Sequence, residues 1–206
     1  MCIFPETADM QDGRDYRKNL ITVHACAEHN LRKSRDDEYL HLILVHGYFN
    51  NPLAGKQFKT KLFRAFSRRP ALLAALYKER TPVVVDDVPT EAVSIDRPRF
   101  ERALEMVFRA LYFKTFSERI SLPVRLHTTL LLDMESTRAD ERNNKVKEFC
   151  RFTQQYVGNC LPVGENPDIF WFKIKRSDTS QFAAYQLSFY GGFDVYVVAS
   201  EKFPQV

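Results

Sequence analysis

Long apolar runs are missing from this sequence, and glycine is scarce. The longest apolar stretch lies around residues 40–45 and is far shorter than the ~20 residues that a membrane-spanning helix requires. The seven glycines and ten prolines leave no low-complexity tract, and no internal repeat is found. These absences argue against a membrane-spanning protein, a repeat protein and a low-complexity segment. They predict a soluble protein without a membrane partner.

Cysteine is also sparse, with four residues at positions 2, 26, 150 and 160. Their spacing lacks the dense pattern of a small secreted domain held together by disulfides, and no signal peptide precedes them. The sequence therefore predicts reduced thiols and a cytoplasmic protein.

What the sequence does contain is enough apolar material for a sizeable core. Hydrophobic residues make up 45% of the chain and aromatic residues 13%, a composition that argues against intrinsic disorder. A length of 206 residues suits one large domain with a small appendage. We expect an N-terminal module at residues 1–50, followed by a larger domain at residues 51–206.

Apolar residues that recur every three or four positions predict helices, and short β-branched or alternating runs predict strands. Helices are expected at residues 27–45, 55–66, 71–77, 98–116 and 137–157. Strands are expected at residues 20–23, 82–87, 91–95, 124–133, 169–175, 183–190 and 193–199. Gly191 and Gly192 suit a two-residue hairpin turn. Strands gathered near the C-terminus beside long helices predict an α+β fold with an antiparallel sheet.

The helix expected at residues 98–116 has the clearest pattern in the chain. Asp96 is placed to cap its N-terminus, and Pro98 suits its first turn. Its apolar stripe, which predicts a core position, comprises Phe100, Ala103, Leu104, Val107, Phe108, Leu111, Tyr112 and Phe116.

Positive charge is concentrated in one part of the chain. Residues 56–80 hold eight basic residues against the single acid Glu79, a balance of +7 in a chain whose net charge is +4. Such a concentration predicts a polyanion-binding surface, although a charged helix is also commonly a solvated face. The candidate nucleic-acid-binding residues are Lys56, Lys59, Lys61, Arg64, Arg68 and Arg69.

The segment VHACAEHNLRKSRDDEYL, residues 23–40, combines several possible metal ligands. Cys26 and His29 are three positions apart, so that a thiolate and an imidazole at a strand-to-helix turn could share one tetrahedral zinc ion. The amide oxygen of Asn30 could reach a hard divalent cation. The alternatives are that Cys26 is a small core residue, that His29 is a surface residue and that Asn30 caps a helix.

This segment resembles the second half of an HNH (ββα-metal) endonuclease module, in a bacterial family that reads approximately V-P-x-C-x-x-C/H-N-x-x-K-S-x-D-D-E-Y-L here. Ile3-Phe4-Pro5-Glu6 resembles the end of the family's H-I-F-P-E segment. Further similar stretches are residues 51–73, 99–113, 164–168 and 190–193. The resemblance implies a truncated, treble-clef-like ββα element followed by a helical segment and a mixed helix and antiparallel-sheet domain. It also implies that the chain begins midway through the nuclease module.

The resemblance assigns roles to individual residues. Cys2 occupies the position of the general-base His, and Asn30 matches the metal ligand on the helix. Asn19 lies two residues too far from Cys26 to match the middle signature residue securely. Cys26 and His29 would form half of a structural zinc site.

His24 stands where the family has proline, and we interpret it as an incidental residue at a strand end. Because a thiol does not replace an imidazole as a general base at neutral pH, we expect metal-dependent hydrolysis of DNA to be weak or absent. The alternative is a catalytically dead domain that binds nucleic acid or a partner protein. A divalent metal such as Mg²⁺ is expected if the protein is active, and zinc is possible at the partial site.

Aromatic residues in the strand expected at residues 169–175 offer a further possible contact with nucleic acid. Phe170, Trp171 and Phe172 could stack on bases. Since neighbouring residues of a strand face opposite sides, at least one of the three is expected to be a core residue.

Overall fold

The structure of the chain is a computed structural model. The structure describes residues 4–7, 14–18, 20–23, 27–68, 70–71, 74, 77–134, 136–179 and 181–203. Cys2, Asn19, His24, Cys26 and Arg69 lie outside these ranges.

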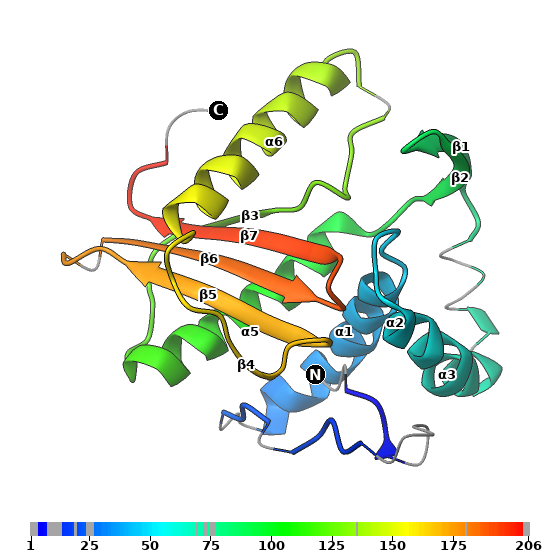
Figure 1. Cartoon of the computed structure of the whole chain (residues 1–206), viewed down its shortest axis with the longest axis horizontal. Helices are drawn as coiled ribbons and strands as arrows, with labels where there is room; N and C mark the ends of the chain where they lie inside the picture. The colour runs from blue at the N-terminus through cyan, green and yellow to red at the C-terminus, as the bar shows by residue number, and fades with distance from the viewer. Residues whose placement is uncertain are drawn as a thin grey trace.

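The described chain contains helices and antiparallel strands in the arrangement that Figure 1 shows. The helical elements are α1 (Ala27–Val45), α2 (Pro52–Gln57), the π-helix η2 (Phe58–Leu62), α3 (Phe63–Arg68), α5 (Arg97–Phe116) and α6 (Ala139–Tyr156). The strands are β1 (Arg80–Val85), β2 (Val88–Val93), β3 (Val124–His127), β4 (Val163–Asn166), β5 (Phe170–Arg176), β6 (Phe182–Phe189) and β7 (Phe193–Ser200). The predicted α+β class is confirmed.

The main sheet has five strands in the order β3-β7-β6-β5-β4, and every neighbouring pair is antiparallel. β1 and β2 form a separate two-stranded hairpin. The predicted antiparallel sheet is thus confirmed. β4 was not predicted from the sequence, because Val163–Asn166 contains a glycine, a glutamate and an asparagine and has little strand propensity.

Helices cover both faces of the main sheet. α5 lies behind the sheet in Figure 1, and Phe108 packs edge-on against Tyr185 of β6 with ring centroids 4.8 Å apart. On the opposite face, the end of α6 packs against β6 and β7, where Val157, Ala184 and Val198 form a small second cluster. The larger core therefore lies between α5, α1 and the sheet.

The predicted helix at residues 98–116 is confirmed as α5. Asp96 caps it by accepting a hydrogen bond from the backbone N–H of Arg99 at 3.0 Å. Ser117 ends the helix in the left-handed conformation, with φ of 57°. The expected core residues Phe100, Leu104 and Phe108 are fully buried.

The second half of α1 lies inside the main core. Residues 39–45 are all buried, and Leu40, Leu42 and Leu44 have no exposed surface. A helix that is buried on all sides is typical of the centre of a domain. α1 therefore connects the N-terminal region to the core of the larger unit, and the domain boundary at residue 50 stays a prediction.

Several predicted elements differ from the observed ones. Residues 20–23 form no strand, since no described segment pairs with them. The strand predicted at residues 124–133 ends at His127, where its pairing with β7 stops, and the backbone N–H of Leu131 then donates to Thr128 in a turn. The helix predicted at residues 55–66 runs from α2 through η2 to α3.

The two hairpin turns also differ from their predictions. β1 and β2 are joined by Asp86 and Asp87, with φ of 49° and 63°, whereas the break was expected at Pro89 and Thr90. In the β6–β7 turn, positive φ occurs at Tyr190 (52°) and Gly191 (68°) rather than at the two glycines. Aspartate tolerates the left-handed region, which explains the first turn.

Within the described residues, no helix combines the length and the apolar character that crossing a bilayer requires.

Candidate functional site

The first turn of α1 carries two of the predicted site residues. α1 begins at Ala27, directly after Cys26, so that His29 and Asn30 are its third and fourth residues. The backbone of α1 is described throughout and its side chains from Asp36 onward. Cys26 lies outside the described residues, and the distance between the proposed zinc ligands stays a prediction.

Polar contacts fix the middle of α1 against α5. Asp36 accepts a hydrogen bond from Nε of Arg99 at 2.8 Å, in a pair that is about three-quarters shielded from solvent. The same guanidinium lies over the ring of Tyr39, 4.4 Å from its centroid. The Tyr39 hydroxyl accepts a hydrogen bond at 2.7 Å from the backbone N–H of Asp96, the residue that caps α5. The orientation of α1 is thus tied to the N-terminus of α5.

His46 fixes the C-terminal end of α1. Its Nδ1 lies 2.6 Å from the carbonyl oxygen of Leu42, and its Nε2 lies beside the hydroxyl of Tyr77. Burial lowers the pKa of His46, so the imidazole is neutral, donates from Nδ1 to the carbonyl and accepts from the tyrosine hydroxyl. The ring of Phe58 packs edge-on at 5.0 Å. His46 is therefore a structural residue.

Three segments that are far apart in the sequence meet at one end of the main sheet. The backbone N–H of Asn51 donates to the carbonyl of Tyr190 at 2.8 Å, and its side-chain amide donates to the carbonyl of Asp168 at 2.6 Å. The backbone N–H of Tyr190 donates to the carbonyl of Ile169 at 2.9 Å. We call these three segments, residues 47–51, 166–169 and 189–192, the junction.

The junction is packed too closely for a side chain at Gly192. A Cβ atom at this position would lie 2.1 Å from the carbonyl oxygen of Phe49. His41 of α1 reaches the junction from the core, with its Nε2 3.1 Å from the Tyr190 hydroxyl. The sequence offered a signal here in the glycine pair, which was interpreted as a hairpin turn, and in residues 164–168, but it did not predict these contacts.

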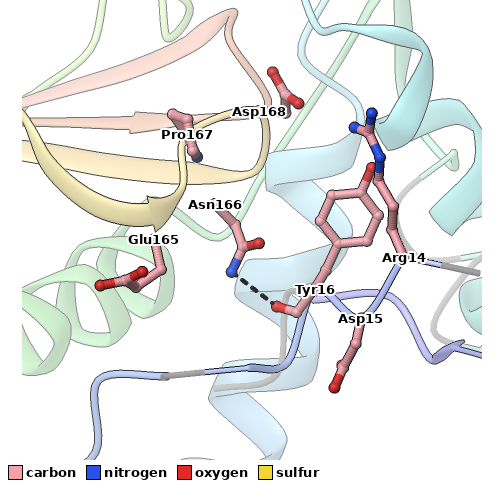
Figure 2. Close-up of a pocket in the computed structure, with 7 residues that line it drawn as sticks. All are labelled: Arg14, Asp15, Tyr16, Glu165, Asn166, Pro167 and Asp168. Carbon is pink, nitrogen blue, oxygen red and sulfur yellow. Dashed lines mark hydrogen bonds between the residues drawn. The ribbon is translucent and has the colours of Figure 1, made fainter.

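The N-terminal region docks on the junction. The side-chain amide of Asn166 donates to the carbonyl of Tyr16 at 3.1 Å, as Figure 2 shows. A shallow polar pocket of about 330 Å³ lies beside this bond, and it is lined by Arg14, Asp15, Tyr16, Glu165, Asn166, Pro167 and Asp168. The lining includes both positively and negatively charged side chains. None of the residues predicted as catalytic or as metal ligands lines the pocket.

Glu6 links the N-terminal region to α3. Its carboxylate lies 3.3 Å from Nη2 of Arg17 and 3.9 Å from Nη2 of Arg64. Glu6 ends the motif that resembles H-I-F-P-E, and Pro5 before it is buried. Exposed ion pairs of this kind stabilise a protein by less than about 1 kcal/mol each. Their consequence is geometric, because they place residues 4–7 beside the basic helical segment.

The basic run at residues 56–80 extends over more than one element of the fold. Lys56, Lys59 and Arg64 are exposed along the helical segment 52–68, and Arg64 is paired with Glu6. Lys61 and Arg68 belong to the same segment, but their side chains are not described. The basic residue Arg80 lies in β1 and pairs with Glu91 of β2 at 3.1 Å. Charges from the two ends of the run therefore lie on different elements.

The aromatic residues of β5 face both sides of the sheet. Phe172 is buried, and Phe170 stacks near it at 6.0 Å and packs against Phe189 at 4.9 Å. Trp171 lies on the opposite face, opposite Ser188 of β6. Phe170 and Phe172 are thus core residues, as expected for at least one of the three.

Two cysteines are described, and both lie near the end of α6. Cys150 is buried, which together with the nearby carboxylate of Asp194 raises its pKa to about 12. Cys160 is half-buried and packs at the edge of the second cluster. Among the residues that the structure describes, no three His, Cys, Asp or Glu side chains lie where they could share a metal ion.

Comparison with known proteins adds no relative. No protein-family model matches the chain, and neither the curated proteins nor the solved structures contain a significant match. The resemblance to HNH endonucleases therefore rests on the motif residues alone.

Proposed function

We propose that this chain is an HNH-endonuclease-like protein that binds DNA and cleaves it weakly or not at all. One observation carries the proposal: α1 begins at Ala27, so that Asn30 occupies the first turn of a long helix. In the ββα-metal module, the helical ligand occupies the same place. The meeting of residues 47–51, 166–169 and 189–192 at the junction supports the proposal, because each lies in or beside a stretch that carries the resemblance.

The way α1 is held suits a helix that positions a site. A catalytic or metal-binding group has to be held within about 0.5 Å of its working position, on an element that the rest of the protein keeps rigid. α1 has its second half in the core, with contacts to α5 through Asp36 and Tyr39 and to the junction through His41. Its first turn extends from this fixed part.

The first turn of α1 fits two separate ions better than one shared ion. His29 and Asn30 are consecutive, and consecutive residues are about 100° apart around a helix axis. We assign Asn30 to a hard divalent cation, and Cys26 with His29 to a partial zinc site. A bound divalent cation would stabilise the negative charge that develops on the phosphate during hydrolysis.

Cys2 is the reason to expect weak cleavage. It stands at the position of the general-base histidine, and a thiol does not accept a proton from water as an imidazole does near neutral pH. Loss of a positioned general base typically lowers the rate about 10²- to 10⁴-fold. Binding of DNA does not depend on this group.

The helical segment 52–68 is the proposed DNA contact. Lys56 and Lys59 are exposed on it, and Arg64 follows on the next turn beside Glu6. Lysine and arginine bind phosphates through charge and release counterions from DNA, so that binding weakens as salt rises. Lys61, Arg68 and Arg69 remain predicted members of the same surface.

A second candidate function is a catalytically dead domain that binds nucleic acid or a partner protein. The thiol at position 2 favours it, because the remaining features of the module serve binding and folding as well as cleavage. The two candidates differ in one property: the first allows weak DNA cleavage that depends on Asn30, and the second allows no cleavage.

Cleavage of supercoiled plasmid with Mg²⁺, Mn²⁺ or Ni²⁺ separates the two candidates. We expect little or no nicking by the wild-type chain, and Cys2→His alone is not expected to restore full activity. Any residual nicking should disappear in Asn30→Ala and persist in Asn144→Ala, an exposed asparagine of α6. Nicking that survives Asn30→Ala unchanged would contradict the assigned metal position. Absence of both nicking and salt-sensitive DNA binding would contradict the proposed function as a whole.

A further inference from the structure

The β1–β2 hairpin projects from the body with one face open to solvent, where Pro82, Val84, Pro89 and Glu91 are exposed. Val84 is 68% exposed on this face, and Val88, near the turn on the other face, is 49% exposed. A two-stranded hairpin is only marginally stable by itself in water and gains stability when it packs against another surface. The exposed face around Val84 therefore suits a partner.

The tip of the hairpin carries negative charge. Asp86 and Asp87 form the two-residue turn, and both are exposed. Two carboxylates at the tip are repelled by the phosphates of DNA. The hairpin is consequently unsuited to DNA and suited to a protein surface with positive charge.

The edges of the hairpin are blocked against strand pairing. Val85 and Val88 flank the two-residue turn and pair by hydrogen bonds, so the next pair, Val84 with Pro89, directs its backbone groups outward. Pro82 lies two residues from Val84 and has the same outward orientation. At both positions another residue would offer an outward backbone N–H to a strand of a partner. Proline has no N–H, so neither edge of the hairpin can pair there. A partner must contact the hairpin by its open face and tip.

A surface of opposite charge lies on the helical segment 52–68 of the same chain. Lys56 and Lys59 are exposed, and within the described part of the chain neither has an ion-pair partner. Phe63 is 62% exposed, and its position four residues after Lys59 makes the two side chains neighbours on a helix surface. In Figure 1 the hairpin and this helical segment project from the same side of the body.

We propose that two copies of this chain form a dimer in which the hairpin of each copy docks on the helical segment 52–68 of the other. Val84 meets the exposed ring of Phe63, and Asp86 and Asp87 meet Lys56 and Lys59. The contact is reciprocal, so a two-fold axis closes it and leaves no surface for a third copy. Apolar contact and charge complementarity act together, as in other specific protein interfaces.

The dimer has a consequence for DNA binding, which rests on the proposed function. Its contacts cover the two lysines that the proposal assigns to DNA phosphates. Dimerisation and DNA binding would then exclude each other, and low protein concentration would favour the DNA-binding form. The dimer is measured without DNA, so its test does not depend on whether the protein binds DNA.

Sedimentation equilibrium at low salt tests the dimer with charge variants of the full chain. We expect a wild-type dimer, and we expect Lys56→Glu/Lys59→Glu to raise its dissociation constant at least roughly tenfold. Lys147→Glu/Arg151→Glu makes the same change of charge on exposed residues of α6 and should leave it unchanged. Asp86→Asn/Asp87→Asn should also weaken the dimer, and asparagine preserves the turn because it tolerates positive φ.

An equal mixture of the two weakened variants provides the decisive comparison. In a mixed dimer the Asp86–Asp87 tip of one variant faces the Lys56–Lys59 segment of the other, so one of the two contacts is restored. The mixture should therefore associate more tightly than either variant alone. A wild-type chain that stays monomeric at about 100 µM, where even weak specific contacts associate, overturns the proposal. A dimer that both variants leave intact, or a mixture no tighter than its components, also overturns it.

Discussion

His41 and Tyr190 are 149 residues apart in the chain, and their side chains meet in the core with Nε2 3.1 Å from the phenol oxygen. His41 belongs to the buried half of α1, and Tyr190 belongs to the β6–β7 turn. This contact joins the helix that carries the proposed metal ligand to the junction. It also gives the turn a reason to hold a tyrosine at a positive φ of 52°.

Tyr190→Phe removes the hydroxyl of this pair and leaves the backbone unchanged. We expect the free energy of unfolding to fall by about 0.5–1.5 kcal/mol, the usual net contribution of one buried hydrogen bond. Urea unfolding measures the change. Tyr48→Phe is the matched control, because Tyr48 is 44% exposed, and it should have no measurable effect.

Gly192→Ala tests the close packing of the junction. The new Cβ would lie 2.1 Å from the carbonyl oxygen of Phe49, so the loop or the hairpin has to move. We expect a loss of at least about 1–3 kcal/mol in the free energy of unfolding. Gly55→Ala should do the opposite and stabilise the protein by about 0.5–1 kcal/mol, because Gly55 lies in α2 with nothing within 4 Å of an added Cβ. Equal effects of the two substitutions would contradict the close approach.

Because burial keeps the His46 imidazole neutral, we expect the free energy of unfolding to fall in mild acid. Its pKa in the folded protein is lowered by burial, so the unfolded chain takes up a proton more readily than the folded one. The stabilising contribution is complete above the unfolded pKa of about 6.5 and is lost as the pH falls from there toward the lowered folded value. Urea midpoints at about pH 7.5, 6.5 and 5.5 measure it.

His46→Gln provides the comparison for this pH dependence. His127 also has a pKa lowered by burial, and it contributes a loss of the same sign that remains in the variant. We expect the decline in the urea midpoint below about pH 6.5 to be smaller in His46→Gln than in the wild type. If the urea midpoint fell equally with pH in the two proteins, burial would not lower the pKa of His46 in the folded state.

Lys56→Glu/Lys59→Glu should weaken non-specific DNA binding and reduce its dependence on salt. In the wild type, the two phosphate contacts of these lysines account for roughly a tenfold loss of affinity between 50 and 200 mM salt. Each contact releases a counterion and so adds to the slope of log affinity against log salt concentration. Fluorescence anisotropy with labelled duplex DNA measures both quantities. Lys147→Glu/Arg151→Glu has the same net charge and lies on α6, so it should retain the affinity and slope of the wild type. An unchanged slope in the first variant would exclude these lysines from the DNA contact.

The sequence predicts the parts of the fold where side-chain patterns are regular. The stripe of α5 recurs at three and four residues, and its members Phe100 and Phe108 are buried as expected. β6 and β7 were likewise predicted close to their observed bounds, because their residues are strongly apolar. β4 was missed, since its pairing with β5 and not its composition makes it a strand. The strand expected at residues 20–23 was wrong for the same reason, because an apolar run needs a partner.

The contacts around the candidate site were less accessible to sequence reasoning. Asn51, Asp168 and Tyr190 are far apart in the chain, and hydrogen bonds to backbone carbonyls leave no pattern in side-chain type. The position of Asn30 in the first turn of α1 agrees with the helix predicted at residues 27–45. The β1–β2 turn was misplaced, because Pro89 was interpreted as a break although proline is tolerated at the edge of a hairpin.

The burial of the second half of α1 limits how this protein can be divided. A fragment that starts after residue 50 would lack seven consecutive buried residues, 39–45, and would expose the apolar surfaces of α5 and the sheet that they cover. If the N-terminal region were exchanged between related proteins, the point of exchange would have to lie before residue 39 to leave the core whole. A division of the chain that keeps the core whole therefore leaves residues 39–45 with the body.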